Sequence, residues 1–215
     1  AQVEPAGRLE VAVAGQEMVV RDVDDLALNG DYFDITRAVL DYMRDSELCC
    51  RISYWTDIPV KAGVAGSTAL TVAILAALLR YKGLSRHRYQ VAELARHIEL
   101  NHLRVVCGYQ DAYMCTFGGL NYMDFRGKEF YRSASEEMYG TVEPLQGFVA
   151  ELPLLLAHTG VTHSSDAVHK PLRERWLEGD PEVRQGYEEI ARLAREGKRA
   201  LLSGDWPRLG VLMNR

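Results

Sequence analysis

The chain has 215 residues, of which 47% are hydrophobic, and its 25 Lys and Arg against 30 Asp and Glu give a formal net charge of -5. This composition is typical of a globular protein with one sizeable core or two modest ones. The basic residues form no block that could serve as a nucleic-acid-binding stripe, so we expect no nucleic-acid partner. The longest apolar run, Ala69–Leu79, falls short of the roughly 20 residues of a membrane span, so we expect no membrane partner.

The four cysteines include no Cys-x-x-Cys pair. Reduced thiols in or near the core are therefore favoured over a disulfide or zinc framework. The first residues carry no signature of a targeting segment. We therefore expect a cytoplasmic location.

Strands and helices are mixed along the chain. Alternating polar and apolar residues indicate strands, and apolar residues at helical spacing indicate helices. Up to residue 125 the predicted elements are strands Leu9–Ala14 and Glu17–Arg21, a helix over 31–44, strand Arg51–Thr56, helices Ser67–Tyr81, Arg88–Asn101 and Gln110–Thr116, and strand Leu120–Phe125. A more polar stretch over 126–147 is a candidate boundary, and it precedes strand Leu152–His158 and helices Ser165–Leu177 and Pro181–Ser203. Because strict strand–helix–strand alternation is missing, we predict an α+β fold.

The segment Asp57–Ala69 has the composition of a loop that binds phosphate. Gly63 and Gly66 allow the backbone to point several N–H groups into one concavity. Ser67 and Thr68 then open the predicted helix, whose unpaired first N–H groups and dipole favour an anion. The Ser67 hydroxyl adds a ligand for a phosphate oxygen or for phosphate-bound Mg²⁺.

The same loop also has a plainer interpretation. An ordinary strand–turn–helix connection uses these residue types, with Gly66 or Ser67 as its N-cap. The loop is not a Walker loop, because Lys61 precedes both glycines. The loop alone therefore leaves both interpretations open.

Three segments together resemble the motifs of the GHMP kinase superfamily. Pro59–Ala69 resembles the second family motif, Pro-x-x-x-Gly-Leu-(Gly/Ser)-(Ser/Gly)-Ser-(Ser/Thr)-Ala. Glu99 matches a glutamate on the following helix, and Gly108-Tyr-Gln-Asp111 before Gly118-Gly119 matches the third landmark. They occur in the family order and at family-like distances, so together they are much more specific than any one of them.

Within the superfamily the chain resembles the glucuronokinases most. The features are Val64-Ala65-Gly66-Ser67-Thr68-Ala69, Gln110-Asp111 leading to Tyr122-Met-Asp-Phe125, and Arg173-Glu-Arg-Trp-Leu-Glu-Gly-Asp180. The heptose 7-phosphate 1-kinases share the Gln-Asp and Gly-Gly pattern and are the nearest rivals. The resemblance extends from about Arg8 to Asn214.

The resemblance implies a GHMP kinase fold, with a ribosomal protein S5 domain 2-like N-terminal part and an α/β C-terminal part. We expect residues 1–145 to form the N-terminal ATP-binding domain and residues 146–215 to begin the C-terminal domain. The family's opening strand with a Pro-Gly-Arg-like motif and its closing glycine-rich motif are not found in these 215 residues. We therefore expect the fold to be incomplete at both ends.

The activity that the resemblance implies is transfer of a phosphoryl group from ATP, with Mg²⁺, to the anomeric hydroxyl of a sugar. D-glucuronate, giving glucuronate 1-phosphate, is the first expectation. The alternatives are another GHMP kinase, acting on a heptose phosphate or another small alcohol, and a catalytically inactive GHMP-fold protein that binds a metabolite. The oligomeric state stays open.

The family motifs assign roles to residues of this chain. Asp111 is the expected catalytic carboxylate, either as a general base or as an electrostatic partner of the sugar hydroxyl. Ser67 and Glu99 are the expected Mg²⁺ ligands. The expected ATP-phosphate cradle consists of Gly63, Ala65, Gly66, Ser67 and Thr68, and the candidate substrate contacts are Tyr109, Gln110, Lys61 and Arg104.

Two of these residues also fit ordinary structural roles. Glu99 could be a solvated helix glutamate paired with Arg96 or His102, three residues away on either side. Asp111 could be a helix N-terminal aspartate that the helix dipole stabilises. The structure has to decide between these interpretations.

Overall fold

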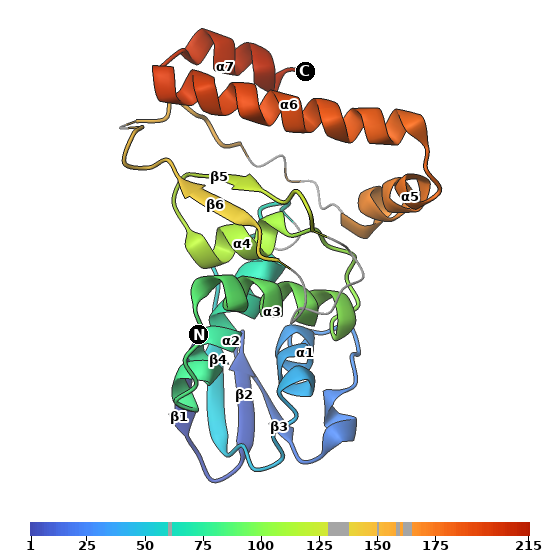
Figure 1. Ribbon diagram of the computed structural model, residues 1–215. Coiled ribbons are helices and arrows are strands. Elements are labelled where there is room, and N and C mark those ends of the chain that lie inside the picture. Colours follow the sequence, from blue (N-terminus) through green and yellow to red (C-terminus); the bar gives the residue numbers. More distant parts are fainter. Residues whose placement is uncertain (60–61, 129–137, 150, 158–159, 161–164) are drawn as a thin grey trace.

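The computed structural model describes residues 1–59, 62–128, 138–149, 151–157, 160 and 165–215 (Figure 1). Its strands are β1 Gln2–Pro5, β2 Leu9–Val13, β3 Gln16–Val20, β4 Cys50–Tyr54, β5 Asn121–Asp124 and β6 Thr141–Pro144. Its helices are a 3₁₀ turn Val23–Leu26, α1 Asp34–Met43, α2 Gly66–Tyr81, α3 Arg88–Asn101, α4 Gln110–Phe117, α5 Ser165–Leu177, α6 Pro181–Ser203 and α7 Trp206–Met213. The predicted α+β class is confirmed.

The four-stranded sheet has the order β1-β4-β2-β3. Strand β4 lies in its interior, antiparallel to β1 and parallel to β2, and β3 pairs antiparallel with β2. The register sets Ile52 of β4 beside both Val3 and Val11. Because β2 and β4 are parallel, the chain must cross over between them, and α1 lies in that connection.

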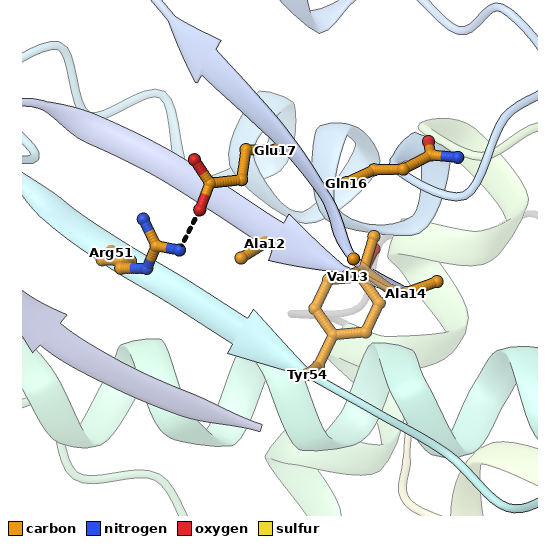
Figure 2. Close-up of a pocket in the computed structure, with 8 residues that line it drawn as sticks. Ala12, Val13, Ala14, Gln16, Glu17, Arg51 and Tyr54 are labelled. Atoms are coloured by element: carbon orange, nitrogen blue, oxygen red, sulfur yellow. Dashed lines mark hydrogen bonds and ion pairs between the residues drawn. The ribbon is translucent and has the colours of Figure 1, made fainter.

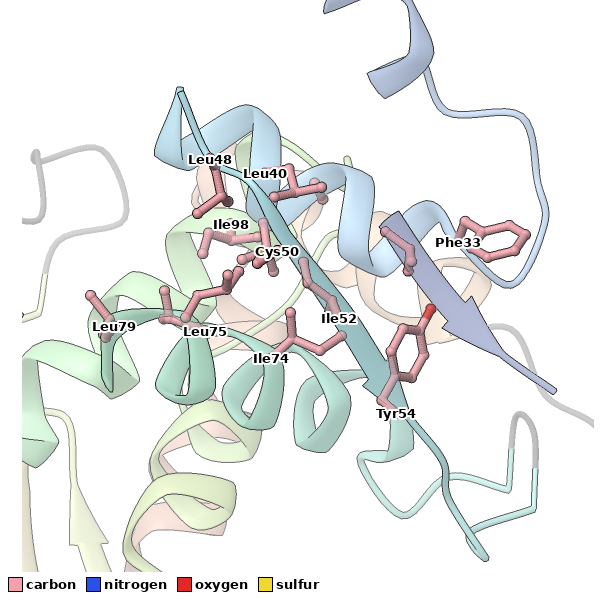
Figure 3. Packing of buried hydrophobic residues seen from close by; sticks show 14 residues of the cluster. Phe33, Leu40, Leu48, Cys50, Ile52, Tyr54, Ile74, Leu75, Leu79 and Ile98 are labelled. Carbon is pink, nitrogen blue, oxygen red and sulfur yellow. The ribbon is translucent and has the colours of Figure 1, made fainter. Parts of the chain in front are cut away.

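The core lies between one face of this sheet and helices α1, α2 and α3. Alternate residues of β4 point into it, and Figure 3 shows Ile52 of this strand against Ile74 of α2, with Leu40 of α1 and Ile98 of α3 close by. Ile52, Ile74 and Ile98 have no exposed surface. This packing fixes α2 and α3 relative to the end of β4, from which the chain runs into the glycine-bearing loop.

The later part of the chain lies at the opposite end of the molecule from the four-stranded sheet, with the β5–β6 ribbon between them (Figure 1). Helix α6 begins at Pro181 with the Asp180 side chain as its N-cap, and it ends at Gly204 in the left-handed region, φ 67°. The Lys198 ammonium of α6 forms an ion pair with Glu143 of β6. In the described part of the chain, no helix has the length and apolar character to cross a membrane.

The sequence-based prediction of several elements was wrong. The predicted strand Leu152–His158 is not formed over residues 152–157, and His158 lies outside the described residues. Strands β1 and β6 and helix α7 were not predicted. Helix α1 begins at Asp34, later than the predicted residue 31.

Candidate functional site

The site is built around the first turn of α2. Ala65 is the N-cap of this helix and adopts the left-handed region with φ 56° and ψ 31°, and Gly63 just before it has φ 72°. At Gly66 the constraint is space, since a Cβ there would lie 3.1 Å from Cγ2 of Ile58. The alanine N-cap offers no side-chain acceptor to the first N–H groups of α2, so these donors face the loop as an anion site requires.

Glu99 of α3 lies against this first turn. Its residue is only 3% exposed, and its Oε1 accepts hydrogen bonds from Ser67 Oγ at 3.1 Å and from Thr68 Oγ1 at 3.0 Å. Thr68 Oγ1 also lies 2.9 Å from Oε2. Burial raises the pKa of Glu99, and the Asp111 carboxylate acts in the same direction, whereas the two hydroxyl hydrogen bonds lower it.

The surroundings of Glu99 rule out the solvated-glutamate interpretation. His102 is hydrogen-bonded to Asp41 instead, with Nδ1 2.6 Å from Oδ2. The Arg96 guanidinium lies over the ring of Tyr109, with Cζ 3.8 Å from the ring centroid. In the part of the chain that the structure describes, Glu99 has no ion pair with any Lys, Arg or His.

Asp111 stands exposed in the first turn of α4, and α4 packs against both α2 and α3. One turn further on, the Cys115 thiol donates to the carbonyl of Ala65 at 3.8 Å, which ties α4 to the loop. Burial, with the Asp111 and Glu99 carboxylates adding to it, raises the pKa of Cys115 to about 11. The two acids therefore lie close enough to act on the same neighbouring groups.

The remaining predicted site residues differ in their burial and surroundings. Gln110 and Arg104 are exposed, and Arg104 follows α3 with a left-handed φ of 61°. Tyr109 is half-buried, and its ring lies beside the Arg96 guanidinium and the Lys128 ammonium. Lys61 lies outside the described residues. The side chains that the structure brings together are those of Ser67, Thr68, Glu99 and Asp111.

Sequence reasoning missed two features of this site. Thr68 was expected in the phosphate cradle, but its buried hydroxyl bonds to both oxygens of Glu99. Cys115 was not singled out, although it lies four residues after Asp111 and therefore on the same side of α4. That spacing was the available signal.

The oxygen donors Ser67, Glu99 and Asp111 suit Mg²⁺, which prefers carboxylate and hydroxyl ligands and keeps several waters or phosphate oxygens. Among the described residues, no group of three or more His, Cys, Asp or Glu could hold a metal ion by itself. Ser67 and Glu99 are the residues of this set that could hold a cation together with a bound phosphate.

A hollow lies at the turn between β2 and β3, lined by residues 12–17, Arg51 and Tyr54 (Figure 2). Arg51 is occupied there by ion pairs with Glu17 and with Glu10, the latter at 3.0 Å. None of the four site side chains lines this hollow. The predicted site residues and this hollow therefore lie in different parts of the described structure.

Known proteins are similar to this chain in sequence and in fold. The GHMP kinases N terminal domain matches residues 34–119, a range that contains the α2 loop, Glu99 and Asp111. Glucuronokinase 1 of Arabidopsis thaliana is 35% identical over 167 residues, which cover 76% of this chain and 44% of that protein. The D-glycero-alpha-D-manno-heptose 7-phosphate kinase of Campylobacter jejuni is 36% identical over 89 residues, which cover 41% of this chain and 26% of that protein.

A solved structure shows the same fold. The D-glycero-D-manno-heptose 1-phosphate kinase of Bacteroides thetaiotaomicron superimposes with a TM-score of 0.65 at 21% identity, covering 98% of this chain and 63% of that one. The chain spans about half the length of the curated relatives it matches, 44% for the glucuronokinase. Residues 34–119 thus match the GHMP kinase N-terminal domain, and the chain is similar to sugar kinases over most of its length.

Proposed function

We propose that the protein is an ATP-dependent sugar kinase that phosphorylates the anomeric hydroxyl of D-glucuronate. The glucuronokinases of Arabidopsis thaliana, at 35% identity, support this choice of sugar. One observation carries the kinase assignment. A buried carboxylate, Glu99, is held by two hydroxyls at the open N-terminus of α2 and has no cationic side chain as an ion-pair partner among the described residues.

This arrangement suits a nucleotide phosphate. The first N–H groups of α2 and the Ser67 hydroxyl bind phosphate oxygens, and the helix dipole favours their negative charge. Glu99 and Ser67 would hold Mg²⁺ together with those oxygens. The chemistry that Mg²⁺ supplies when bound is neutralisation of the charge on the phosphates.

Asp111 is the residue that we assign to the acceptor sugar. Its exposed carboxylate, in the first turn of α4, accepts a hydrogen bond from the attacking hydroxyl and orients it. The hydroxyl oxygen forms a bond to the γ-phosphorus, the bond from that phosphorus to the bridging oxygen breaks, and ADP leaves. The hydroxyl proton passes to the Asp111 carboxylate. Most of the rate enhancement in such a transfer comes from positioning and electrostatics.

Glucuronate carries a carboxylate that needs a cationic partner. Arg104 is the candidate that the structure describes, because it is exposed and lies three residues after the end of the helix that bears Glu99. Lys61, which precedes α2 in the sequence and lies outside the described residues, is the other candidate. A guanidinium binds a carboxylate through two parallel hydrogen bonds, which is the stronger arrangement.

The test is ADP release from Mg-ATP by the full-length protein against D-glucuronate, D-galactose, a heptose 7-phosphate and mevalonate, with Asp111→Ala beside it. The proposal expects turnover with glucuronate that Asp111→Ala abolishes. Turnover confined to the heptose phosphate would favour the second candidate, which the 36% identity over 89 residues to a heptose 7-phosphate kinase supports. Absence of ATP binding and of turnover on every acceptor would overturn the kinase proposal in favour of a metabolite-binding protein.

A further inference from the structure

Helix α3 carries a second buried charged group, on the side that faces α4. Glu93 and Arg96 are only 4% and 6% exposed, and they lie six and three residues before Glu99, about two turns and one turn. The Lys128 ammonium pairs with Glu93 at 2.6 Å, and both of these side chains are almost fully buried. The proposed phosphoryl transfer uses none of these three residues.

This cluster, defined by Glu93, Arg96 and Lys128, holds the ring of Tyr109. Arg96 Cζ lies 3.8 Å from the ring centroid, and Lys128 Nζ lies 4.5 Å from it. Both distances are well within the range of a cation–π interaction, which is strongest where the cation is desolvated. The ring of Phe125 stacks on Tyr109 as well, with a centroid distance of 5.6 Å and an interplanar angle of 26°.

The next turn of α4 is held by the same cluster. The Tyr113 hydroxyl donates to Glu93 Oε1 and accepts from the backbone N–H of Gly140 at 2.9 Å. Tyr113 is fully buried, and its backbone N–H closes the first turn of α4 by bonding to the carbonyl of Tyr109 at 3.1 Å. Two successive turns of α4 are therefore anchored to α3.

Asp111 lies between these two anchors, two residues after Tyr109 and two before Tyr113. Residues two apart on a helix point to different sides, so the tyrosines can face the cluster while Asp111 faces the loop of α2. The position of Asp111 relative to the α2 loop then depends on the contacts that Tyr109 and Tyr113 make on the other side of α4.

We propose that Tyr109 is a positioning residue, whose ring, held by Arg96 and Lys128, sets the first turn of α4 and so the placement of the Asp111 carboxylate. This inference rests on the proposed function. It replaces the expectation that Tyr109 contacts the sugar. The face of the ring carries the interaction, and the phenol hydroxyl is not needed for it.

The two roles are separated by paired variants of the full-length protein. Tyr109→Leu removes the ring, and we expect kcat to fall by about 10- to 30-fold, the loss that corresponds to a desolvated cation–π contact, with KM for the sugar within about twofold of the parent value. Tyr109→Phe keeps the ring, and we expect it to restore most of kcat. A raised sugar KM in Tyr109→Phe with kcat intact would show direct sugar contact and overturn the proposal.

A second readout does not depend on the kinase activity. Hydrogen exchange of the Tyr113 amide, which closes the first turn of α4, should speed up by about 10- to 30-fold in Tyr109→Leu and stay near the parent rate in Tyr109→Phe. The matched control is Tyr122→Leu on β5, which removes a ring whose centroid lies 4.6 Å from the Lys198 ammonium of α6. This variant should leave the exchange rate of the Tyr113 amide unchanged.

The readouts distinguish the possible failures. If the parent protein phosphorylates no sugar but the exchange pattern is as expected, the proposed function fails and the anchoring of α4 stands. If Tyr109→Leu leaves both kcat and the Tyr113 amide unchanged while the parent is active, Tyr109 does not position Asp111 and the inference is wrong.

Discussion

Helix α3 buries two glutamates, six residues apart, in opposite surroundings. Glu93 is neutralised by Lys128 at 2.6 Å and receives the Tyr113 hydroxyl. Glu99 receives only hydroxyl hydrogen bonds from α2, lies near the Asp111 carboxylate, and has its pKa raised by burial. Both residues are less than 5% exposed.

The difference separates a structural buried charge from a functional one. The Glu93–Lys128 ion pair is complete within the protein and joins α3 to the segment that follows β5, and removing one partner would leave an uncompensated buried charge. A buried carboxylate that lacks a cationic side chain costs stability, and such a cost is found where a ligand or cation completes the charge balance. On helix α3, Glu93 therefore belongs to the structural support of the candidate site, and Glu99 belongs to the candidate site.

The largest effect on activity is expected at Asp111, the carboxylate that lies near Glu99. Asp111→Asn removes the proposed acceptor for the sugar proton, and kcat should fall by about 10²- to 10⁴-fold. KM for ATP should change little, because the phosphate cradle is intact. Steady-state kinetics measure both. The control is Asp124→Asn at the end of β5. That carboxylate pairs with the exposed Arg126, and the substitution should leave kcat unchanged.

Removing the charge of the other buried glutamate, Glu93, should lower the free energy of unfolding. Glu93→Gln leaves the Lys128 ammonium buried without its charge partner, and the free energy of unfolding should fall by about 3–5 kcal/mol. Urea denaturation measures this change. The double variant with Lys128→Met, which removes both charges, should recover much of the loss, and no recovery would contradict the assignment of a complete ion pair.

A smaller effect is expected at the α2 hydroxyl. Ser67→Ala removes a hydrogen bond of 3.1 Å to Glu99 and a proposed phosphate ligand, so KM for ATP should rise by about 10-fold, as for loss of one hydrogen bond to a charged group. Ser203→Ala is the matched control, since that hydroxyl donates to the Arg199 carbonyl within α6 at 3.0 Å. An equal effect of both variants would argue against a ligand role for Ser67.

The smallest expected effect is on the pH dependence of stability. Because burial raises the pKa of Glu99 in the folded protein, the ionised form costs stability that the protonated form does not. The difference in unfolding free energy, parent minus Glu99→Gln, should be highest below the ordinary glutamate pKa of 4.5 and fall as the pH rises through the folded-state pKa. A difference that rises with pH would contradict this sign.

Much of the first half of the fold could be predicted from local pattern. The apolar run after Ser67 and the helical spacing of Val91, Leu94 and Ile98 placed α2 and α3. Strand β1 was missed because Gln2–Pro5 has little apolar alternation and is formed by pairing with the distant β4. The leucines of 152–157 have the composition of a strand, but the structure forms none there. The division at residues 145 and 146 stays a prediction.

The residues of the candidate site could be predicted where they belong to short sequence motifs. The glycines, Ser67, Glu99 and Asp111 follow from short segments, and their assembly from three helices follows from the core packing. The partner of Glu99 could not be read from the sequence, since only the tertiary fold shows that Thr68 bonds to it and that His102 is occupied by Asp41. Lys128 gave no signal either, because it lies 35 residues from the glutamate it neutralises.

The most direct test of the contrast is the unfolding free energy of Glu99→Gln with and without Mg-ATP. Without ligand, the variant should be at least as stable as the parent, because an uncompensated buried charge is removed. With Mg-ATP at about 100 times its Kd, the parent should gain about 2.7 kcal/mol, and the variant should lose most of this gain. A variant that is destabilised like Glu93→Gln and still gains fully from Mg-ATP would show that Glu99 is a structural residue and contradict the account.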